Sequence, residues 1–344
     1  MSSVSLAVKY RPKTWDDVVE QDTIKKILNE QIETNQLKRV LLFTGSAGTG
    51  KTTNARIFGR EIEPCKSNIV EVNCADNTGV EDIRVIIQNA KSKPLQGRYK
   101  VFILDESHML TVQSQNALLK LLEEPPVFDI FIMCTTDPQK VLPTILSRSY
   151  RYDFQKISFK GIVDRLNYIL EKEKQDPEGC GIENWDQSAI SYIARTANGG
   201  MRDAITLLDK VISYSKNITI DDVVKVLGVT DYDIQFDILD ALNSKNEEQL
   251  TIKLEEVYRS GKDLKLFIKN FLTFVLDVNK YITLRNFDYI SIPDIYLSRL
   301  NNYNMGHKSY LKYLLAKLLE LNSSIRWETN PKTLLESSFL LEVL

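Results

Sequence analysis

The sequence predicts an α/β core built on a parallel sheet, followed by two regions made only of helices. Up to residue 157, short apolar runs alternate with helical patterns, and the runs are almost continuously apolar, as in strands covered on both faces. After Phe154 the strand signals stop and amphipathic helical patterns fill the chain. Because 344 residues exceed one compact core, we expect three domains, at residues 1–157, 158–230 and 231–344.

Four segments are expected as strands, with helices between them. The expected strands are residues 39–45, 69–73, 100–106 and 129–136. The expected helices are residues 50–62, 79–92 and 114–126, and two prolines stop the last one. Beyond residue 231 the helices carry broad leucine-rich stripes, as in "SYLKYLLAKLLELNSSIRW". Such stripes face either an internal bundle or a neighbouring subunit, and their spacing fits both.

The composition describes an ordinary soluble globular protein, with 43% hydrophobic and 26% charged residues. The formal net charge of −2 gives no global sign of nucleic-acid binding, so such a contact requires a local basic surface or an assembly of chains. No segment has the roughly 18 uninterrupted apolar residues of a membrane span, and residues 1–13 lack the apolar run of a signal peptide. We therefore expect a cytoplasmic protein without a membrane partner.

The four cysteines form no CxxC pair and are far apart in the sequence. This spacing predicts reduced thiols in the core, with neither a zinc site nor a disulfide framework. The cysteines are Cys65, Cys74, Cys134 and Cys180.

The segment "GSAGTGKT" (45–52) fits the phosphate-binding pattern G-x-x-x-x-G-K-[ST]. Its glycines let the backbone wrap around phosphate, Lys51 reaches the β- and γ-phosphates, and the Thr52 hydroxyl is placed to bind Mg²⁺. A chance match in a glycine-rich turn is the alternative, but a strand precedes this loop and a helix follows it. We expect ATP and Mg²⁺ here. The expected nucleotide-binding residues of the loop are Gly45, Ser46, Ala47, Gly48, Thr49, Gly50, Lys51, Thr52 and Thr53.

Two adjacent acids end the apolar run "VFILDESH" (101–108). Asp105 is expected on the metal side of the site, and Glu106 can polarise a water, as metal-assisted phosphoryl transfer requires. A solvated acidic loop is the alternative. His108 completes a superficial D-E-x-H pattern, and we interpret it as a packing residue without a role.

Three further polar positions are considered for a role at the nucleotide. Thr136, at the tip of the fourth strand, can hydrogen-bond the γ-phosphate or the attacking water, or it can simply be a β-branched residue ending a strand. Arg202, in "NGGMRDA", lies in the first turn of a helix and can reach back to the nucleotide. Arg148, in "TILSRSY", can be an ordinary surface arginine.

Six segments together resemble one family over nearly the whole chain. They are "VKYRPKTWDDVVEQ", "GSAGTGKTT", "DESHMLTVQSQNALLKLLEEPP", "CTTDPQKVLPTILSRS", "NGGMRDAITLLDK" and "TNPKTLLESSFLLEVL". The chain is similar to the motor subunits of bacterial clamp loaders, the gamma/tau family of DNA polymerase III. The resemblance implies an α/β P-loop NTPase core of the AAA+ class with a parallel sheet, an all-α lid domain and an all-α collar domain that oligomerises.

The resemblance gives Arg148 a role in trans. In this family the arginine of a Ser-Arg-Cys motif is an arginine finger that reaches the ATP site of the adjacent subunit. Arg148 matches it, although Ser149 replaces the cysteine. A guanidinium there neutralises charge on the γ-phosphoryl oxygens, which can raise the rate about 10³–10⁵-fold.

Other roles follow from the same resemblance. Thr136 matches sensor 1 and Arg202 matches sensor 2, both of which act with Lys51, Asp105 and Glu106 in hydrolysis. Five residues match the segment that packs around adenine and ribose: Tyr10, Arg11, Pro12, Val18 and Val19. Arg84 and Lys120 match residues that face the DNA backbone. From the sequence alone these two would be solvated surface charges, but five copies in a spiral would sum them into a groove that follows phosphates.

The resemblance implies that the chain hydrolyses ATP to load a ring-shaped sliding clamp onto primer–template DNA during replication. The implied partners are other clamp-loader subunits in a ring or spiral of five, the clamp and DNA. The family's four-cysteine zinc module is absent, and the chain stops at Leu344 without the tau extension. We therefore expect a compact subunit from a minimal bacterial or a phage replisome.

Three other functions remain open. One is a different AAA+ DNA-remodelling ATPase, of the branch-migration or recombination type. Another is a non-catalytic scaffold subunit, which the intact Lys51, Thr52, Asp105 and Glu106 disfavour. A D-E-x-H helicase is the third, but it would need a second core domain where this chain is helical.

Overall fold

The structure is a computed structural model that describes residues 4–76, 79–227, 232–261, 263–293, 296–325 and 328–341. The chain divides into two compact units, and each is described by itself. The first unit comprises Met1–Gly179 and Ala197–Asp209, and the second comprises Cys180–Thr196 and Lys210–Leu344. The three-domain division expected above stays a prediction.

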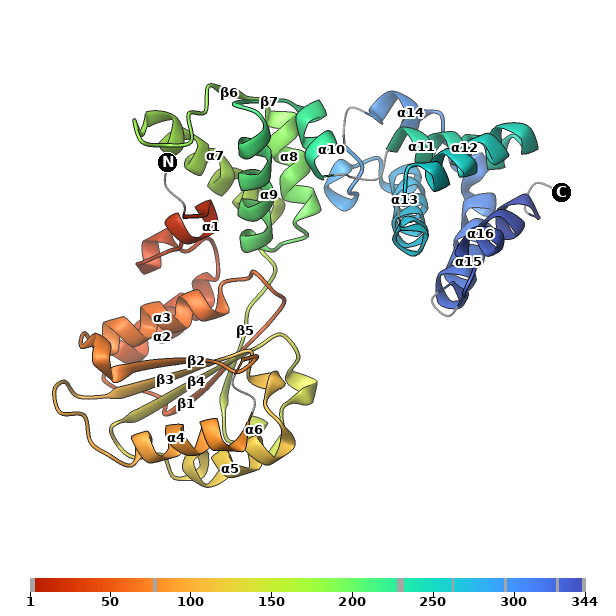
Figure 1. Cartoon of the computed structure of the whole chain (residues 1–344). Coiled ribbons are helices and arrows are strands. Elements are labelled where there is room, and N and C mark those ends of the chain that lie inside the picture. Colours follow the sequence, from red (N-terminus) through yellow and green to blue (C-terminus); the bar gives the residue numbers. More distant parts are fainter. Residues whose placement is uncertain are drawn as a thin grey trace. The chain divides into compact units, whose positions relative to one another are not determined.

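The first unit is built on a five-stranded sheet in the order β2-β3-β4-β1-β5, and every pair of neighbours is parallel (Figure 1). The strands are β1 (Val40–Thr44), β2 (Ile69–Asn73), β3 (Lys100–Asp105), β4 (Asp129–Thr135) and β5 (Tyr150–Asp153). The predicted fold class is confirmed. Strand β5 was not predicted, because it is a short edge strand in which only Tyr152 is buried.

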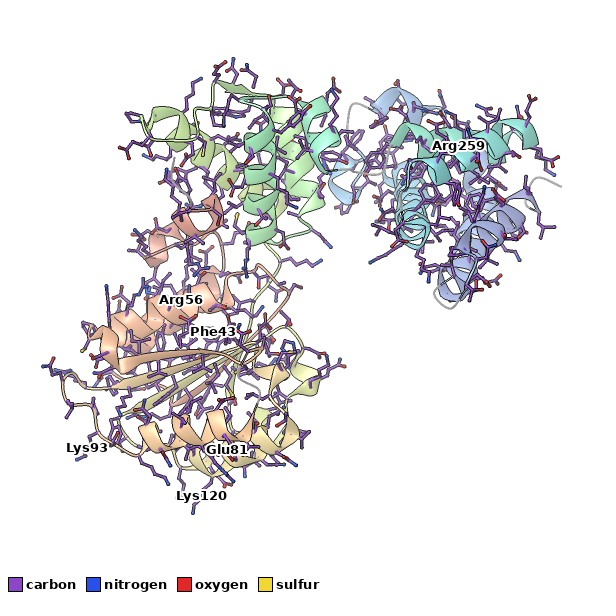
Figure 2. The ribbon with its side chains drawn as sticks, in the orientation of Figure 1. Phe43, Arg56, Glu81, Lys93, Lys120 and Arg259 are labelled. Carbon is purple, nitrogen blue, oxygen red and sulfur yellow. The ribbon has the colours of Figure 1, made fainter. Side chains whose placement is uncertain are left out.

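Side chains of the central strands alternate between two apolar layers, because successive strand residues point to opposite faces. On one face, Leu41 and Phe43 pack with α2 (Asp22–Glu33) and α3 (Lys51–Ile62). The other face carries α4 (Val80–Ala90), α5 (Val112–Glu123) and α6 (Pro143–Leu146). Figure 1 shows the two helical layers on either side of the sheet, and Figure 2 labels Phe43 inside it. Burying one such side chain stabilises the fold by about 1.5–3 kcal/mol.

Local signals set the ends of these helices. Helix α5 begins where the Thr111 side chain accepts a hydrogen bond from the Ser114 backbone N–H, and it ends before Pro125 and Pro126. Short 3-10 turns connect the elements of this unit: η1 (Trp15–Asp17), η2 (Lys66–Asn68), η3 (Ser107–Met109) and η4 (Pro138–Lys140).

Three helices add to the sheet module of the first unit. They are α1 (Leu6–Lys9), α7 (Phe159–Gln175), and the first residues of α9 (Met201–Tyr214). Ser158 caps α7 by accepting a hydrogen bond from the Gly161 backbone N–H. These helices bring residues of the N-terminal segment and of the region after residue 158 to the carboxyl edge of the sheet.

In its described residues, the second unit is helical apart from one pair of two-residue strands. Strands β6 (Asn184–Trp185) and β7 (Asn217–Ile218) are parallel, and neither was predicted from the sequence. Helices α8 (Gln187–Thr196) and α10 (Ile220–Leu227) lie in contact beside them.

The rest of the second unit packs around one aromatic and leucine-rich core. Its elements are α11 (Tyr232–Asn243), α12 (Glu247–Arg259), α13 (Leu264–Leu284), η5 (Phe287–Tyr289), α14 (Leu297–Asn301), η7 (Met305–His307), α15 (Lys308–Ser324) and α16 (Pro331–Leu340). The stripe of α15 is buried in this core, including Leu311, Leu314 and Leu318. Of the two interpretations of the leucine stripes, the internal bundle therefore holds for α15. In the described part of the chain, no helix is both long and apolar enough to span a membrane.

Candidate nucleotide-binding site

The glycine-rich loop connects β1 to α3 at the carboxyl edge of the sheet, where open parallel sheets bind ligands. Gly48 and Gly50 have φ angles of +73° and +99°, in the region that favours glycine. At Gly45, with φ +146°, an added Cβ would lie 2.5 Å from the Phe154 carbonyl oxygen. The loop therefore tolerates only glycine at the points where its backbone turns.

Lys51 is folded into this loop. Its side chain is 6% exposed and donates hydrogen bonds from Nζ to the carbonyl oxygens of Gly45 and Ser46, both at 2.9 Å. Burial lowers the pKa of Lys51, while the negative charges of Glu106 and Asp105 act in the opposite direction. A phosphate group at this loop would supply the counter-charge that such a buried ammonium favours.

Thr52 and Asp105 meet at the foot of the loop. The Thr52 hydroxyl donates to Asp105 Oδ1 at 2.8 Å, which joins the start of α3 to the end of β3. A hydroxyl and a carboxylate oxygen are the ligand types that Mg²⁺ takes in proteins. These two residues therefore fit a magnesium ion bound beside the phosphates.

Glu106 follows Asp105 in a left-handed backbone conformation, with φ +51°. This turn directs its side chain toward the tip of β4, where Thr136 Oγ1 donates to Glu106 Oε2 at 3.4 Å. Nδ1 of His108 lies 3.4 Å from the same carboxylate oxygen. Glu106 thus has neighbours on two sides, Thr136 directly after β4 and His108 on η3.

A cavity of about 520 Å³ lies over the loop, and this volume is in the range of about 300–1,000 Å³ typical of small-molecule sites. Twelve residues predicted for nucleotide binding or catalysis line it: Tyr10, Arg11, Pro12, Val18, Val19, Ala47, Gly48, Thr49, Gly50, Lys51, Thr52 and Thr53. Asp105, Glu106 and Arg202 line it as well. Gly45 and Ser46 instead supply the carbonyl acceptors for Lys51, and Thr136 contacts Glu106.

The N-terminal side of the cavity is attached to α7. Tyr10 donates from its hydroxyl to Glu173 Oε1 at 2.6 Å, and Lys9 Nζ lies 2.6 Å from the same oxygen. Arg165 Nη2 donates to the Tyr10 carbonyl oxygen at 3.0 Å. Burial, followed by the bond to Glu173, raises the pKa of Tyr10 above its ordinary value, so the hydroxyl stays a donor.

The first turn of α9 closes on the glycine-rich loop. The Met201 backbone N–H donates to the Gly48 carbonyl oxygen at 3.0 Å. The side of α9 also holds the N-terminal segment, because the Leu6 backbone N–H donates to Asp209 Oδ2 at 3.1 Å. Arg202 lines the cavity from this first turn. Nucleotide-binding loop, N-terminal segment and α9 are thus linked by hydrogen bonds within the first unit.

Several lining residues were missed by the sequence analysis. They are Ala7, Asp17, Asn54, Arg56, Glu71, Asn73, Ile157, Arg165, Met201, Asp203 and Ile205. Arg56 pairs with Glu71 through Nε and Oε2 at 2.7 Å. No sequence signal identifies Arg165, since its partner Tyr10 is 155 residues away.

Arg148 lies apart from this cavity, on an exposed surface. Its side chain is 35% exposed and forms an ion pair with Glu123, while Nη1 donates to the Thr144 carbonyl oxygen at 2.9 Å. Arg148 is not one of the described residues that line the cavity. The structure therefore gives this arginine no contact with the nucleotide loop of its own chain.

Arg84 and Lys120 lie on α4 and α5, the two helices that cover the same face of the sheet. Both side chains are exposed, and Arg84 pairs with Glu81. Figure 2 shows Lys120 on the side of α5 that faces away from the sheet. Neither cation lines the cavity, and the sheet lies between α3 on one side and α4 and α5 on the other.

The parallel sheet, the glycine-rich loop and the acidic pair at its carboxyl edge define a P-loop nucleotide-binding protein of the AAA+ class. The structure of Thermotoga maritima RuvB, a Holliday junction branch migration motor, has the same fold. Its TM-score is 0.50, with 21% identity, over 66% of this chain and 78% of that chain.

Three family models match consecutive parts of the chain. They describe the DNA polymerase III delta subunit (residues 67–158), the ATPase lid domain of a DNA polymerase III clamp loader subunit (161–217), and domain III of the DNA polymerase III subunits gamma and tau (218–304). This chain belongs to the gamma/tau family of DNA polymerase III clamp-loader subunits.

Several curated proteins that are similar to this chain carry the names of this family. DNA polymerase III subunit tau of Bacillus subtilis is 35% identical over 82% of this chain and 53% of its own length. The gamma/tau subunit of Mycoplasma genitalium is 32% identical over 92% of this chain and 55% of its own length. The tau subunit of Escherichia coli is 34% identical over 76% of this chain and 43% of its own length. The chain thus spans about half the length of the curated relatives it matches.

Proposed function

We propose that this chain is the ATP-hydrolysing subunit of a clamp loader, which places a ring-shaped sliding clamp on primer–template DNA. The observation that carries this proposal is a division of the hydrolysis residues. Lys51, Thr52, Asp105 and Glu106 gather around one cavity, whereas Arg148 lies on a separate exposed surface. Such a division fits an ATPase that is active only when subunits stand side by side, which is how a clamp loader would couple turnover to assembly.

In this proposal the loop residues bind and orient ATP. Backbone N–H groups between Gly48 and Thr52 point at the phosphates, and the Lys51 ammonium offsets their charge. Thr52 and Asp105 hold Mg²⁺, which when bound polarises the phosphoryl oxygens. Tyr10, Pro12 and the two valines of the N-terminal segment enclose the adenosine part.

Glu106 acts on the attacking water. The water oxygen bonds to the γ-phosphorus, and the bond from that phosphorus to the β,γ-bridging oxygen breaks. The water proton passes to Glu106, and the products are ADP and phosphate. Thr136 orients the same carboxylate through its hydroxyl, and Arg202 reaches the phosphates from α9.

Arg148 completes the site of the neighbouring subunit. Its present partner Glu123 forms an exposed ion pair, and such pairs contribute only about 0–1 kcal/mol. It is therefore favourable for Arg148 to leave Glu123 and to bind the γ-phosphoryl group of ATP in the neighbouring subunit. The exposed Arg84 and Lys120 contact the DNA backbone inside the assembly, where copies add to the electrostatic attraction.

The test is co-purification with a sliding clamp in the presence of a non-hydrolysable ATP analogue, followed by ATPase assays with primer–template DNA. We expect clamp retention only with nucleotide, and ATP turnover that clamp and DNA together stimulate. If the chain hydrolysed ATP in the presence of junction DNA and did not associate with a clamp, that result would contradict clamp loading and favour a branch-migration ATPase.

A further inference from the structure

The histidine of the "DESH" segment lies beside the carboxylate of Glu106. His108 has a side chain that is 11% exposed, with Nδ1 at 3.1 Å from Thr135 Oγ1 and 3.4 Å from Glu106 Oε2. We propose that His108 is a positioning residue, which fixes the Glu106 carboxylate through Nδ1. This inference rests on the proposed role of Glu106 in ATP hydrolysis.

In this proposal the imidazole ring of His108 carries a hydrogen on Nδ1. A carboxylate oxygen only accepts hydrogen bonds, so the approach to Glu106 is attractive when Nδ1 carries a hydrogen. Thr135 Oγ1 already accepts from the Asp137 backbone N–H at 3.0 Å and still has a free lone pair. The Nδ1–H tautomer therefore lies between Thr135 and Glu106 and can donate to both.

Two groups approach one oxygen of Glu106. Thr136 Oγ1, at the tip of β4, donates to Oε2 at 3.4 Å, and Nδ1 of His108, on η3, lies 3.4 Å from the same oxygen. Within the described residues no hydrogen bond to Oε1 is present. Such hydrogen bonds are commonly long before a substrate binds and shorten in the reactive complex. This arrangement holds one oxygen and leaves the other to take the proton of water.

Without these contacts the carboxylate would be free to rotate. The Glu106 side chain is 38% exposed, so solvent does not restrict its rotamers. The turn that carries His108 is itself fixed, because Ser107 Oγ donates to the Cys134 carbonyl oxygen at 3.1 Å and the Met109 backbone N–H donates to the Glu106 carbonyl oxygen at 2.8 Å. His108 lies on the fixed turn η3 and contacts Thr135 of β4, so it restricts the rotation of the Glu106 side chain.

Two amide substitutions separate this role from packing. In an asparagine, the amide nitrogen takes nearly the place of imidazole Nδ1, whereas in a glutamine it takes nearly the place of Nε2. We expect His108→Asn to keep kcat of the DNA- and clamp-stimulated ATPase within about 3-fold of wild type, because the donor is retained. We expect His108→Gln and His108→Leu to lower kcat by about 10-fold or more, because the acid is no longer oriented. The Kd for ATP should be unchanged in all three.

The assay uses the full chain assembled with its co-purified subunits, and each variant is checked by circular dichroism and by its melting temperature. Met109→Ala is the matched control, since this neighbour on η3 is 46% exposed. Equal kcat in His108→Asn, His108→Gln and His108→Leu would overturn the proposal. Glu106→Gln tests the proposed function separately: if that variant keeps full turnover, the role of Glu106 itself is wrong.

Discussion

The nucleotide cavity and the surface around Arg148 differ in how firmly the rest of the chain holds their polar side chains. In the cavity, Lys51 is buried with two carbonyl acceptors, and the Thr52 hydroxyl is bonded to Asp105. Around Arg148, by contrast, an exposed guanidinium is held by Glu123 alone among side chains of the described residues. Folding of one chain thus orders the side chains of the cavity, whereas Arg148 stays on an exposed surface. In the proposed function, this difference means that ATP binding requires one chain and that rapid hydrolysis requires the assembly.

The largest effect is expected for Arg148→Ala, which removes the contribution of the exposed surface. The stimulated ATPase of the assembly should fall by about 10³-fold, because charge on the γ-phosphoryl oxygens is no longer offset. The Kd for ATP should stay the same, as measured with a fluorescent ATP analogue. Arg151→Ala is the matched control, because Arg151 is also exposed and pairs with Asp153. Equal losses in the two variants would refute a specific role for Arg148.

A second prediction concerns the cavity. Tyr10→Phe removes only the hydroxyl that Tyr10 donates to Glu173, so the N-terminal segment is held less firmly over the cavity. The Kd for ATP should rise by about 2–10-fold, which corresponds to the roughly 0.5–1.5 kcal/mol of one typical intramolecular hydrogen bond, with kcat at saturating ATP unchanged. Isothermal titration calorimetry measures the Kd. Tyr168→Phe on α7 serves as the control, and a Kd shift in that variant alone would reverse the assignment.

A third prediction uses the opposite end of β4, far from the cavity. Asp129 is fully buried, and within the described residues neither carboxylate oxygen has a hydrogen-bond partner. Burial raises the pKa of Asp129 to about 7, although the cations Lys100 and Arg39 oppose this shift. The folded pKa lies above the unfolded pKa of about 3.9, so the stabilising contribution is complete below pH 4 and is lost as the pH rises through 7.

Asp129→Asn should therefore raise the melting temperature by a few degrees at pH 8 and much less at pH 5. Scanning calorimetry at the two pH values measures this difference. ATP binding should not change, because the cavity lies at the other end of the strand. An equal shift at both pH values would show that the Asp129 charge is not the cause.

The smallest effect is expected for Glu123→Gln, which weakens the ion pair that holds Arg148. The stimulated ATPase should rise by no more than about 5-fold, since exposed ion pairs contribute about 1 kcal/mol at most. A decrease in turnover would mean that Glu123 positions Arg148 for the neighbouring site rather than holding it away. Steady-state ATPase assays of the assembly distinguish the two results.

The sequence allowed the parallel core and the residues of contiguous motifs to be predicted. The strands β1, β3 and β4 are continuous apolar runs, and Lys51, Asp105 and Glu106 stand at fixed positions after them. Strand β5 could not be predicted in this way, since an edge strand needs few apolar residues. Strands β6 and β7 have only two residues each, which is too short for an apolar pattern.

The supporting contacts of the site were out of reach because they join distant segments. Glu173 meets Tyr10 across 163 residues, and Asp209 meets Leu6 across 203 residues. His108 was interpreted as a packing residue, because its spacing in the sequence does not reveal that η3 turns Nδ1 toward Glu106. The roles of Thr136, Arg148 and Arg202, and those of Arg84 and Lys120, remain predictions.

The most direct measurement is ATP turnover per chain as a function of protomer concentration, with primer–template DNA present and light scattering used to follow association. If a neighbour must supply Arg148, turnover should be negligible where the chain is monomeric and should rise together with assembly, and Arg148→Ala should abolish this rise. Monomers that hydrolyse ATP as fast per chain as the assembly would contradict the account.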